Sequence, residues 1–360
     1  MKKLLSVFLS LLLALTALAA CKPGTPPPES GSLNVLNFGE YISDGSEGTD
    51  DVIADFEKET GLKVNYDTVD TNEKLYAKLK GGGVSYDVIV ASDYMLARLM
   101  DEGMLQKLDY GKITNWGNID EKYKKPYFDP EQEYTVPYFV GYTGICYNTK
   151  YVKGTPDSWE ALWDTGLKDG KGNGKSLLFD NPRDAFAVAQ GLLGYDFNSA
   201  DKAQWEAAAG KLKEQKAVRY GFVVDDIFNI MENNEAWITS CYAGDAVIMM
   251  ERNEKLDFVT PKEKVNFFID SFALMKDAAS PLAAHKFIDF MTGGEAALAN
   301  AEYVVYASPN TKVVENPEYE YYEDEILYPA EEDMPGTEVF KDLPQDIIDF
   351  YNTLWNDIKK

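Results

Sequence analysis

The chain has 360 residues, of which 35 are Lys or Arg and 60 are Asp or Glu, so its formal net charge is −25 at pH 7. This acidic excess argues against a nucleic-acid-binding protein, because such proteins present basic surfaces to the phosphate backbone. An apolar content of 45% predicts a globular body, and the length favours two domains over one.

The first residues predict an exported lipoprotein. A basic pair, Lys2 and Lys3, precedes an apolar run and then small residues, which is the layout of a secretory signal. The Leu-Ala-Ala-Cys step ending at Cys21 resembles the lipobox of bacterial lipoproteins, where cleavage leaves a lipidated cysteine. We expect residues 1–20 to be a signal peptide and residues 21–32 to be a lipidated cysteine with a flexible tether. An ordinary signal peptide and an uncleaved membrane helix are the alternatives.

Strands and helices alternate through the first part of the folded chain. The helix at 50–61 places Val52, Ile53 and Phe56 on one face and stops at Gly61, and Ser92 is a candidate N-cap. Three strand-to-helix steps favour right-handed crossovers and a mostly parallel sheet. The predicted elements are strands at 33–38, 62–69 and 86–90 and helices at 50–61, 72–83 and 93–103.

The same alternation recurs in the middle of the chain. We therefore expect two α/β sheets, joined through extended segments such as residues 133–144. The predicted elements are strands at 142–148, 176–180 and 236–242 and helices at 158–164, 183–194 and 201–215.

Aromatic and acidic residues follow the predicted strands, at the ends where open parallel sheets bind ligands. Carboxylates hold ammonium groups by charge-assisted hydrogen bonds, and aromatic faces attract cations by about 0.5–2 kcal/mol each. The pattern therefore favours an organic cation, although chance pairing in so acidic a chain is the alternative. Gly39 is expected to let the chain turn close to the ligand. These strand-end groups are Phe38 to Tyr41, Ser92 to Tyr94, Asp180 and Asn181 with Asp184, Tyr242 with Asp245, and Phe268 with Asp270.

Other chemical signals are weaker. The single histidine, His285, lies in a helix-like segment, which favours a helix-face residue over a catalytic triad or a multi-histidine metal site. Tyrosines at 319, 321 and 322 could ligate ferric iron, and packing in a C-terminal lobe is the alternative. Cys146 and Cys241 could form one disulfide or remain separate buried thiols.

The order and spacing of several segments resemble the spermidine/putrescine-binding family of ABC-transporter solute receptors. The resemblance implies a type II periplasmic-binding-protein-like fold, with two α/β lobes joined by crossing strands and a polyamine enclosed between them. The first lobe would comprise residues 33–139 plus 270–309, and the second 140–269 plus 310–360. The segments that carry the resemblance include NFGEYI, YDVIVASDYM, EYTVPYFVGYTGICYN, SLLFDNPRDAF, IDSFALM, ASPNT and LYP.

The resemblance also implies which residues bind the ligand. Asp184 and Asp270 match carboxylates that hold amines. The chain departs from the family pattern at three wall positions of the cleft, where Phe38, Tyr242 and Phe268 stand in place of the Trp that relatives often carry. Asn181 stands where a carboxylate is expected, with Asp180 as a possible substitute, and Lys341 would oppose a bound amine. The aromatic walls would be Phe38, Tyr41, Tyr94, Tyr242, Phe268 and Tyr306, with Glu40, Ser92, Asp93 and Asn181 bordering the ligand.

The function implied by the resemblance is an extracytoplasmic receptor, lipid-anchored to the bacterial cell membrane through Cys21. It would capture spermidine or putrescine and deliver it to the permease subunits of an ABC importer. We expect a monomer that is not an enzyme, needs no cofactor or metal and binds no nucleic acid. The alternatives are a receptor of the same fold for ferric iron or another small solute, and a secreted carbohydrate-active enzyme with paired carboxylates.

Overall fold

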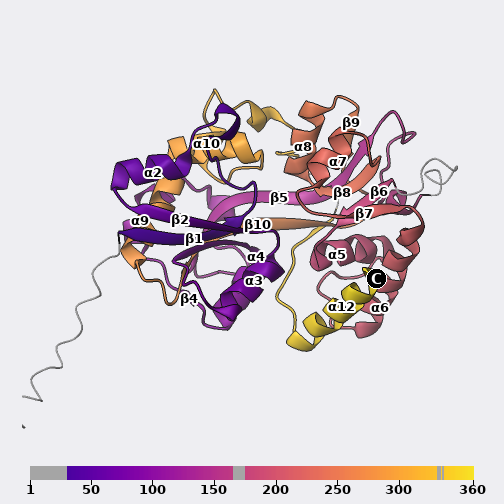
Figure 1. The fold of residues 1–360 in the computed structure, drawn as a ribbon, viewed down its shortest axis with the longest axis horizontal. Helices are drawn as coiled ribbons and strands as arrows, with labels where there is room; N and C mark the ends of the chain where they lie inside the picture. The colour runs from indigo at the N-terminus through magenta and orange to yellow at the C-terminus, as the bar shows by residue number, and fades with distance from the viewer. Residues whose placement is uncertain (1–30, 165–174, 331–333, 335) are drawn as a thin grey trace, which may run out of the picture.

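The computed structural model describes residues 31–164, 175–330, 334 and 336–360 (Figure 1). The strands are β1 (Ser32–Phe38), β2 (Lys63–Val69), β3 (Val88–Ser92), β4 (Leu105–Gln106), β5 (Thr135–Asn148), β6 (Ser176–Phe179), β7 (Arg219–Val223), β8 (Ile238–Tyr242), β9 (Leu256–Val259), β10 (Val265–Met275) and β11 (Thr337–Glu338). The α-helices are α2 (Val52–Thr60), α3 (Asn72–Gly81), α4 (Asp93–Asp101), α5 (Pro182–Leu193), α6 (Lys202–Glu214), α7 (Ile227–Glu232), α8 (Ala243–Arg252), α9 (Pro281–Met291), α10 (Gly294–Val304), α11 (Thr311–Val314) and α12 (Gln345–Ile358).

The strands form a path with the order β2-β1-β3-β10-β5-β8-β6-β7. At one end β1 runs parallel to β2 and β3, and at the other β6 runs parallel to β7 and β8. Strands β10 and β5 are antiparallel to their neighbours and lie between these groups. We call the part built on β1 to β3 the first lobe and the part built on β6 to β8 the second lobe. The predicted two-lobed α/β fold is confirmed.

Strand β5 connects the lobes, as predicted for the extended segment 133–144. Its first half pairs with β10, and residues from Thr143 to Tyr147 pair with β8. All of its residues are buried, as expected for a strand shared by two sheets. The pairing of β10 with β5 shifts register between Asp270 and Ser271. Such irregularities often occur beside binding sites, where they change the direction of a side chain.

Helices cover both faces of each sheet (Figure 1). In the first lobe α2, α9 and α10 lie on one face and α3 and α4 on the other, while in the second lobe α7 and α8 face α5, α6 and α12 across the sheet. Phe56 of α2 packs edge-on against Phe287 of α9 at 5.2 Å between ring centroids. Trp205 of α6 stacks on Tyr351 of α12 at 4.9 Å. Each lobe thus buries large side chains in a core of its own, worth about 1.5–3 kcal/mol per side chain.

Local sequence signals explain both ends of α2. Asp51 caps α2 by accepting a hydrogen bond from the Ala54 amide, and Gly61 ends the helix in a left-handed conformation, as predicted. The segment 158–164 differs from the predicted helix, because only a 3-10 helix forms there, from Trp159 to Trp163. So short a segment cannot sustain an α-helix alone. Its tighter turn places Trp159 and Leu162 on one side, where both are buried.

The remaining chemical candidates have structural roles. His285 is buried and accepts a hydrogen bond at Nε2 from the Asp109 amide at 2.9 Å, while Nδ1 contacts the Pro281 carbonyl oxygen at 2.6 Å. The prediction of a helix-face histidine is therefore confirmed. Within the described chain Cys146 and Cys241 are free, buried thiols. They are diagonal neighbours on β5 and β8, because Cys146 is paired with Thr239. Burial raises the pKa of the Cys241 thiol, and its contact with Cys146 raises it further.

The three tyrosines near residue 320 contact other aromatic rings and polar groups. Tyr319 is buried in the core cluster of the first lobe, together with Val313, which corrects the expectation of packing in a C-terminal lobe. Tyr321 donates a hydrogen bond to Glu251 Oε1 at 2.8 Å, and Tyr322 packs against Tyr328. Across the described residues, no group of three or more His, Cys, Asp or Glu side chains is arranged to hold a metal ion. In the same ranges no helix is long and apolar enough to span a membrane.

Candidate ligand-binding site

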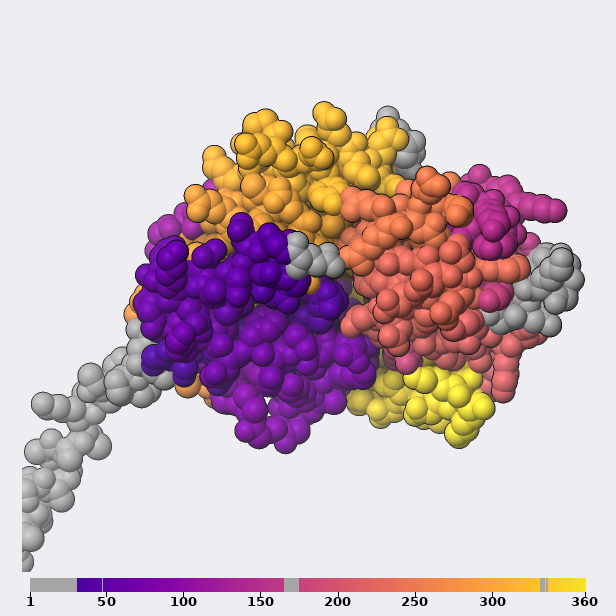
Figure 2. All heavy atoms as spheres, turned by 45° about the horizontal axis from the view of Figure 1, so that its top comes forward, coloured from indigo at the N-terminus to yellow at the C-terminus, as the bar shows by residue number. Residues whose placement is uncertain are grey.

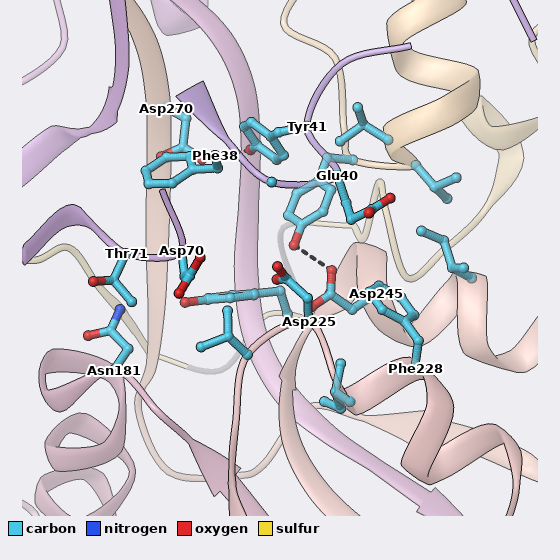
Figure 3. A pocket seen from close by; sticks show the side chains of 18 of the residues that line it. Phe38, Glu40, Tyr41, Asp70, Thr71, Asn181, Asp225, Phe228, Asp245 and Asp270 are labelled. Carbon is cyan, nitrogen blue, oxygen red and sulfur yellow. Dashed lines mark hydrogen bonds between the residues drawn. The ribbon is translucent and has the colours of Figure 1, made fainter. Parts of the chain in front are cut away.

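A cavity of about 690 Å³ lies where the two lobes face each other (Figures 2 and 3). All the residues predicted to contact a ligand line it, so the structure brings them together even though they are far apart in the sequence. They come from the end of β1, the start of α4, the start of α5, the end of β8, strand β10 and the segment after α10. The predicted residues that line the cavity are Phe38, Glu40, Tyr41, Ser92, Asp93, Tyr94, Asn181, Asp184, Tyr242, Phe268, Asp270 and Tyr306.

The segment after β1 differs from its predicted conformation. The left-handed residue is Glu40, with φ of 50°, rather than Gly39. A Cβ atom on Gly39 would lie 3.1 Å from Asp225 Oδ2 of the second lobe. Glycine therefore leaves room here for the close approach of the two lobes, and it does not serve a left-handed turn. Ser92 occupies the N-cap position of α4, but its side chain makes no capping bond and accepts a hydrogen bond from Asn72 Nδ2 at 2.9 Å.

Tyrosine hydroxyl groups donate hydrogen bonds to three carboxylates of the cavity, of which Asp184 and Asp270 are buried and Asp245 is half-buried. These pairs fix the side chains from both lobes, and the third is drawn as a dashed line in Figure 3. A hydrogen bond to a carboxylate is worth about 1.5–3 kcal/mol, more than a bond between neutral groups. The pairs are Tyr41 to Asp270 Oδ2 at 2.6 Å, Tyr242 to Asp184 Oδ2 at 2.9 Å and Tyr306 to Asp245 Oδ1 at 2.7 Å.

Two of these carboxylates retain an oxygen atom without a partner. Asp184 Oδ1 and Asp270 Oδ1 are buried and accept no hydrogen bond from any described residue. The same holds for Asp93 Oδ2, next to the Tyr94 wall. A buried acceptor without a donor costs about 1–3 kcal/mol, and more when it is charged. The arrangement therefore favours a ligand that brings hydrogen-bond donors and positive charge.

Burial sets the protonation of the cavity carboxylates. It raises the pKa of Asp184 and of Asp245 to about 7, and that of Asp270 to about 6. The pKa of Asp93 is also raised well above its usual value, again mainly by burial. The tyrosine hydrogen bonds to Asp184 and Asp245 oppose the rise but do not cancel it. A bound cation would favour the ionised form of each carboxyl group.

Aromatic rings form a continuous wall beside these carboxylates. Tyr41 meets Phe38 edge-on at 5.7 Å and Tyr306 at 5.4 Å between centroids. Tyr242 meets Phe268 edge-on at 5.5 Å. Such edge-to-face contacts add about 0.5–1.5 kcal/mol beyond simple burial. Rings held in this way are rigid surfaces against which methylene groups can pack.

The sequence interpretation did not include Asp225, which lines the cavity, and it noted Asp245 without assigning it to the ligand set. Burial raises the pKa of Asp225, and the like charges of Asp70 and Glu40 raise it further. Asp225 also raises the pKa of Asp245, and Figure 3 shows both side chains directed into the cavity. Asp225 follows β7, a strand absent from the predicted elements. Its position just after a strand is the same signal that identified the other cavity residues, so predicting β7 would also have identified Asp225.

Asp180 and Lys341, both named with the predicted departures, do not line the cavity. Asp180 does not replace the carboxylate expected at Asn181, because it forms an ion pair with Lys359 at 2.5 Å and does not line the cavity. Asn181 instead donates a hydrogen bond to Asp184 Oδ2 at 2.6 Å and caps α5. Lys341 does not line this cavity, so it does not oppose a bound amine there. It lines a second, smaller cavity of about 170 Å³.

Comparison with known proteins places these features in a family. The family described as bacterial extracellular solute-binding protein matches residues 51–327. The chain is 33% identical over 334 residues to the spermidine/putrescine-binding periplasmic protein of Escherichia coli K12, covering 92% of this chain and 93% of that protein. It is 32% identical to the putrescine-binding periplasmic protein of the same strain, covering 87% of each.

Solved structures agree with this assignment. A protein of Listeria monocytogenes, 36% identical, superposes with a TM-score of 0.85 and covers 92% of this chain and 99% of that chain. The spermidine/putrescine ABC transporter substrate-binding protein of Streptococcus pneumoniae is 34% identical, with a TM-score of 0.73 over 91% of this chain and 99% of that one.

Proposed function

Because the chain belongs to the bacterial extracellular solute-binding proteins, we propose that it is the polyamine receptor of an ABC importer. Members of this family bind solutes rather than transform them, so the chain is not an enzyme. Its relatives are named for binding spermidine and putrescine and for serving an ABC transporter. The proposed ligand is therefore spermidine or putrescine, and the proposed partners are the permease subunits of an importer.

The charge of the cavity is the observation that carries this proposal. Of the described residues that line it, Arg252 is the one basic side chain, and it pairs with Glu232 at 3.3 Å. A set of carboxylates without matching cations is costly unless the ligand supplies positive charge. The acidic residues that line the cavity are Glu40, Asp70, Asp93, Asp184, Asp225, Asp226, Asp245, Glu251, Asp270 and Glu302.

The predicted site residues divide into two roles in this proposal. Asp184 and Asp270 hold the ammonium groups through their unpartnered oxygens, and the ring walls cover the methylene groups between them. Asp184 belongs to the second lobe and Asp270 lies on crossing strand β10, so a ligand that contacts both favours the arrangement with the lobes together. Glu40, Ser92, Asp93 and Asn181 border the ligand. The proposed lobe boundaries are 33–139 plus 270–309 for the first lobe and 140–269 plus 310–360 for the second, except that Val313 and Tyr319 pack in the core of the first lobe.

Isothermal titration calorimetry with putrescine and spermidine tests the function directly. We expect micromolar or tighter binding of at least one of them, and none of ferric iron or neutral sugars. Asp270→Asn should weaken binding by about 1.5–3 kcal/mol, because it removes a charge-assisted bond. Asp180→Asn is the matched control, since it makes the same substitution at a carboxylate that lies outside the cavity. No binding of either polyamine would contradict the proposal, and binding of iron or another solute would favour the alternative receptor.

The proposed location is the outer face of the cell membrane, as a lipid-anchored monomer. The relatives are periplasmic or extracellular proteins, which supports an extracytoplasmic location. The signal peptide, Cys21 and the tether to residue 30 lie outside the described residues, and β1 begins at Ser32. Labelling with a palmitate analogue tests the anchor: the wild type should incorporate label and stay with membranes, whereas Cys21→Ser should do neither. Light scattering of the soluble protein tests the monomer.

A further inference from the structure

Arg183 is a buried cation just behind the cavity wall. It lies in the first turn of α5, directly before Asp184, and only 2% of its surface is exposed. The N-terminus of a helix carries a partial positive charge, so a cation in this turn is unfavourable. Something other than helix stability must therefore account for an arginine at this position.

The hydrogen bonds of Arg183 all go to neutral oxygen atoms. Its guanidinium donates to the Phe197 carbonyl at 3.1 Å, to Asn198 Oδ1 at 3.1 Å and to the Lys341 carbonyl at 3.2 Å. None of the carboxylates in the described ranges forms an ion pair with it, and its Nε atom has no partner there. Burying a cation without a contacting anion costs several kcal/mol. That cost falls when nearby carboxylates create a negative potential.

Aromatic rings separate Arg183 from the ligand cavity. The guanidinium carbon lies 4.5 Å from the Phe340 ring centroid, 5.6 Å from that of Tyr94 and 5.8 Å from that of Trp205. Tyr94 belongs to the first lobe, and the segment that carries Phe340 passes between α4 and α5 on its way to α12 (Figure 1). Tyr94 and Phe340 line the ligand cavity, whereas Arg183 lines only the second cavity behind them.

Glu73 completes this arrangement from the first lobe. Its Oε1 accepts a hydrogen bond from the Tyr94 hydroxyl at 2.9 Å, and its Oε2 has no partner among the described residues. Glu73 and Arg183 line the second cavity together. An acidic and a basic side chain from opposite lobes therefore line the same cavity behind the Tyr94 ring.

We infer that Arg183 is a positioning residue that acts as the fixed counter-ion of the ligand site. From behind the wall of Tyr94 and Phe340 it keeps the carboxylates ionised for a cationic ligand, without occupying the ligand's place. It also attracts the ring and the carboxylate of the first lobe toward the second lobe. This inference rests on the proposed function, since it assigns Arg183 a part in holding a cation.

The electrostatics agree with this geometry. Burial raises the pKa of Asp184, of Asp93 and of Glu73, and at each of them the charge of Arg183 acts in the opposite direction. Without it, more of the carboxyl groups would be protonated near neutral pH and could not form charge-assisted bonds to an ammonium group. The charge of Arg183 acts on Glu73 of α3, Asp93 and Tyr94 of α4, Tyr127, Asp184 of α5, Asp342 of the C-terminal segment and Tyr351 of α12. The other titratable and charged groups that line the same cavity are Tyr76, Arg98, Lys341 and Asp349.

Carboxyl-carbon NMR of the ligand-free protein tests the inference, with the Asp184 signal followed against pH. Arg183→Gln keeps a donor for the neutral oxygens but removes the charge, so the Asp184 titration midpoint should rise by about one pH unit. Arg183→Lys keeps the charge and should leave the midpoint close to that of the wild type. Arg98→Met is the matched control: Arg98 lines the same second cavity but pairs with Glu102 at 3.2 Å, and its loss should not move the midpoint.

The same shift should appear in ligand binding. Putrescine affinity of Arg183→Gln should fall about tenfold at pH 6.5 and recover toward wild type at pH 9, where the carboxyl groups ionise without help. An unchanged midpoint in Arg183→Gln, or equal shifts in the Gln and Lys variants, would overturn the inference. If Arg183→Gln does not fold, Arg183→Lys tests the inference alone: a raised Asp184 titration midpoint in this variant, despite the retained charge, would contradict the inference. Failure of the wild type to bind polyamines would refute the proposed function alone, since the NMR titration needs no ligand.

Discussion

Asp184 lowers the stability of the ligand-free protein at neutral pH, so replacing it with asparagine should stabilise the fold while weakening ligand binding. Its pKa is about 7 in the folded chain, against 3.8 for the exposed group. Between these values the folded state holds a proton that the unfolded state has lost. Stability therefore falls as pH rises from about 4 to 7, and the loss is complete above pH 7.

The size of this effect follows from the pKa difference. About three pH units at 1.36 kcal/mol each give an upper figure of about 4 kcal/mol. Asparagine retains an oxygen that can accept from Tyr242 or Asn181, but each bond becomes weaker without the charge, which removes about 1 kcal/mol. We expect Asp184→Asn to raise the free energy of unfolding by about 3 kcal/mol at pH 8 and by almost nothing at pH 4.

Urea denaturation from pH 4 to pH 8 measures this difference, and calorimetry with putrescine measures the binding loss. Asp180→Asn is the control, because its surface ion pair with Lys359 predicts a change below about 1 kcal/mol at every pH. A variant less stable than the wild type at pH 8 would refute the reasoning. So would a gain that does not depend on pH, since it would not come from protonation.

Three further predictions concern the same cavity. Putrescine affinity should rise between pH 5 and pH 8, because three carboxyl groups must ionise to bind the ligand: Asp270, with a pKa of about 6, and Asp184 and Asp245, with pKa values of about 7. Calorimetry in buffers of different ionisation enthalpy should detect proton release on binding at pH 6 and little at pH 9. An affinity that does not change with pH would contradict this prediction. Gly39→Ala should weaken binding without lowering ligand-free stability, because its Cβ would lie 3.1 Å from Asp225 Oδ2 when the lobes are together. In the control Gly81→Ala the added Cβ has nothing within 4 Å, so binding should not change, while alanine at the end of α3 should stabilise the fold slightly. Equal affinities of the two variants would count against this prediction. Tyr306→Phe should raise the pKa of Asp245, because it removes the hydrogen bond from Tyr306 to that carboxylate. The variant's loss of putrescine affinity should therefore be larger at pH 7 than at pH 9. A loss that does not depend on pH would point to packing instead.

The fold was largely predictable because its strands and helices have strong periodicity. The alternation in the first lobe and the long buried segment that became β5 follow from apolar patterns that tertiary contacts did not override. Strand β7 was not predicted because its residues are mostly half-exposed, with buried Val223 at one end, so they lack a clear two-residue alternation. The 3-10 helix at Trp159 was mistaken for an α-helix because length, rather than composition, decides between them.

The site was predictable to the extent that strand ends determine it. Side chains after β1, β3, β6 and β8 converge on one cavity because parallel strands end at the same edge. The directions of adjacent side chains were not predictable. Asp180 and Asn181 are neighbours, yet the cap of α5 turns Asn181 into the cavity and leaves Asp180 beside Lys359. Asp225 was missed together with the strand that precedes it.

Asp225, whose side chain limits the space at Gly39, lies nearly two hundred positions away, which explains why local sequence could not indicate this contact. Asp225 reaches Gly39 only when the lobes face each other, and there it also meets the like charges of Asp70 and Glu40. Repulsion among these groups opposes the approach of the lobes, whereas a cation between them reverses its sign. Closure of the cavity should therefore respond to the charge of the ligand as well as to its shape.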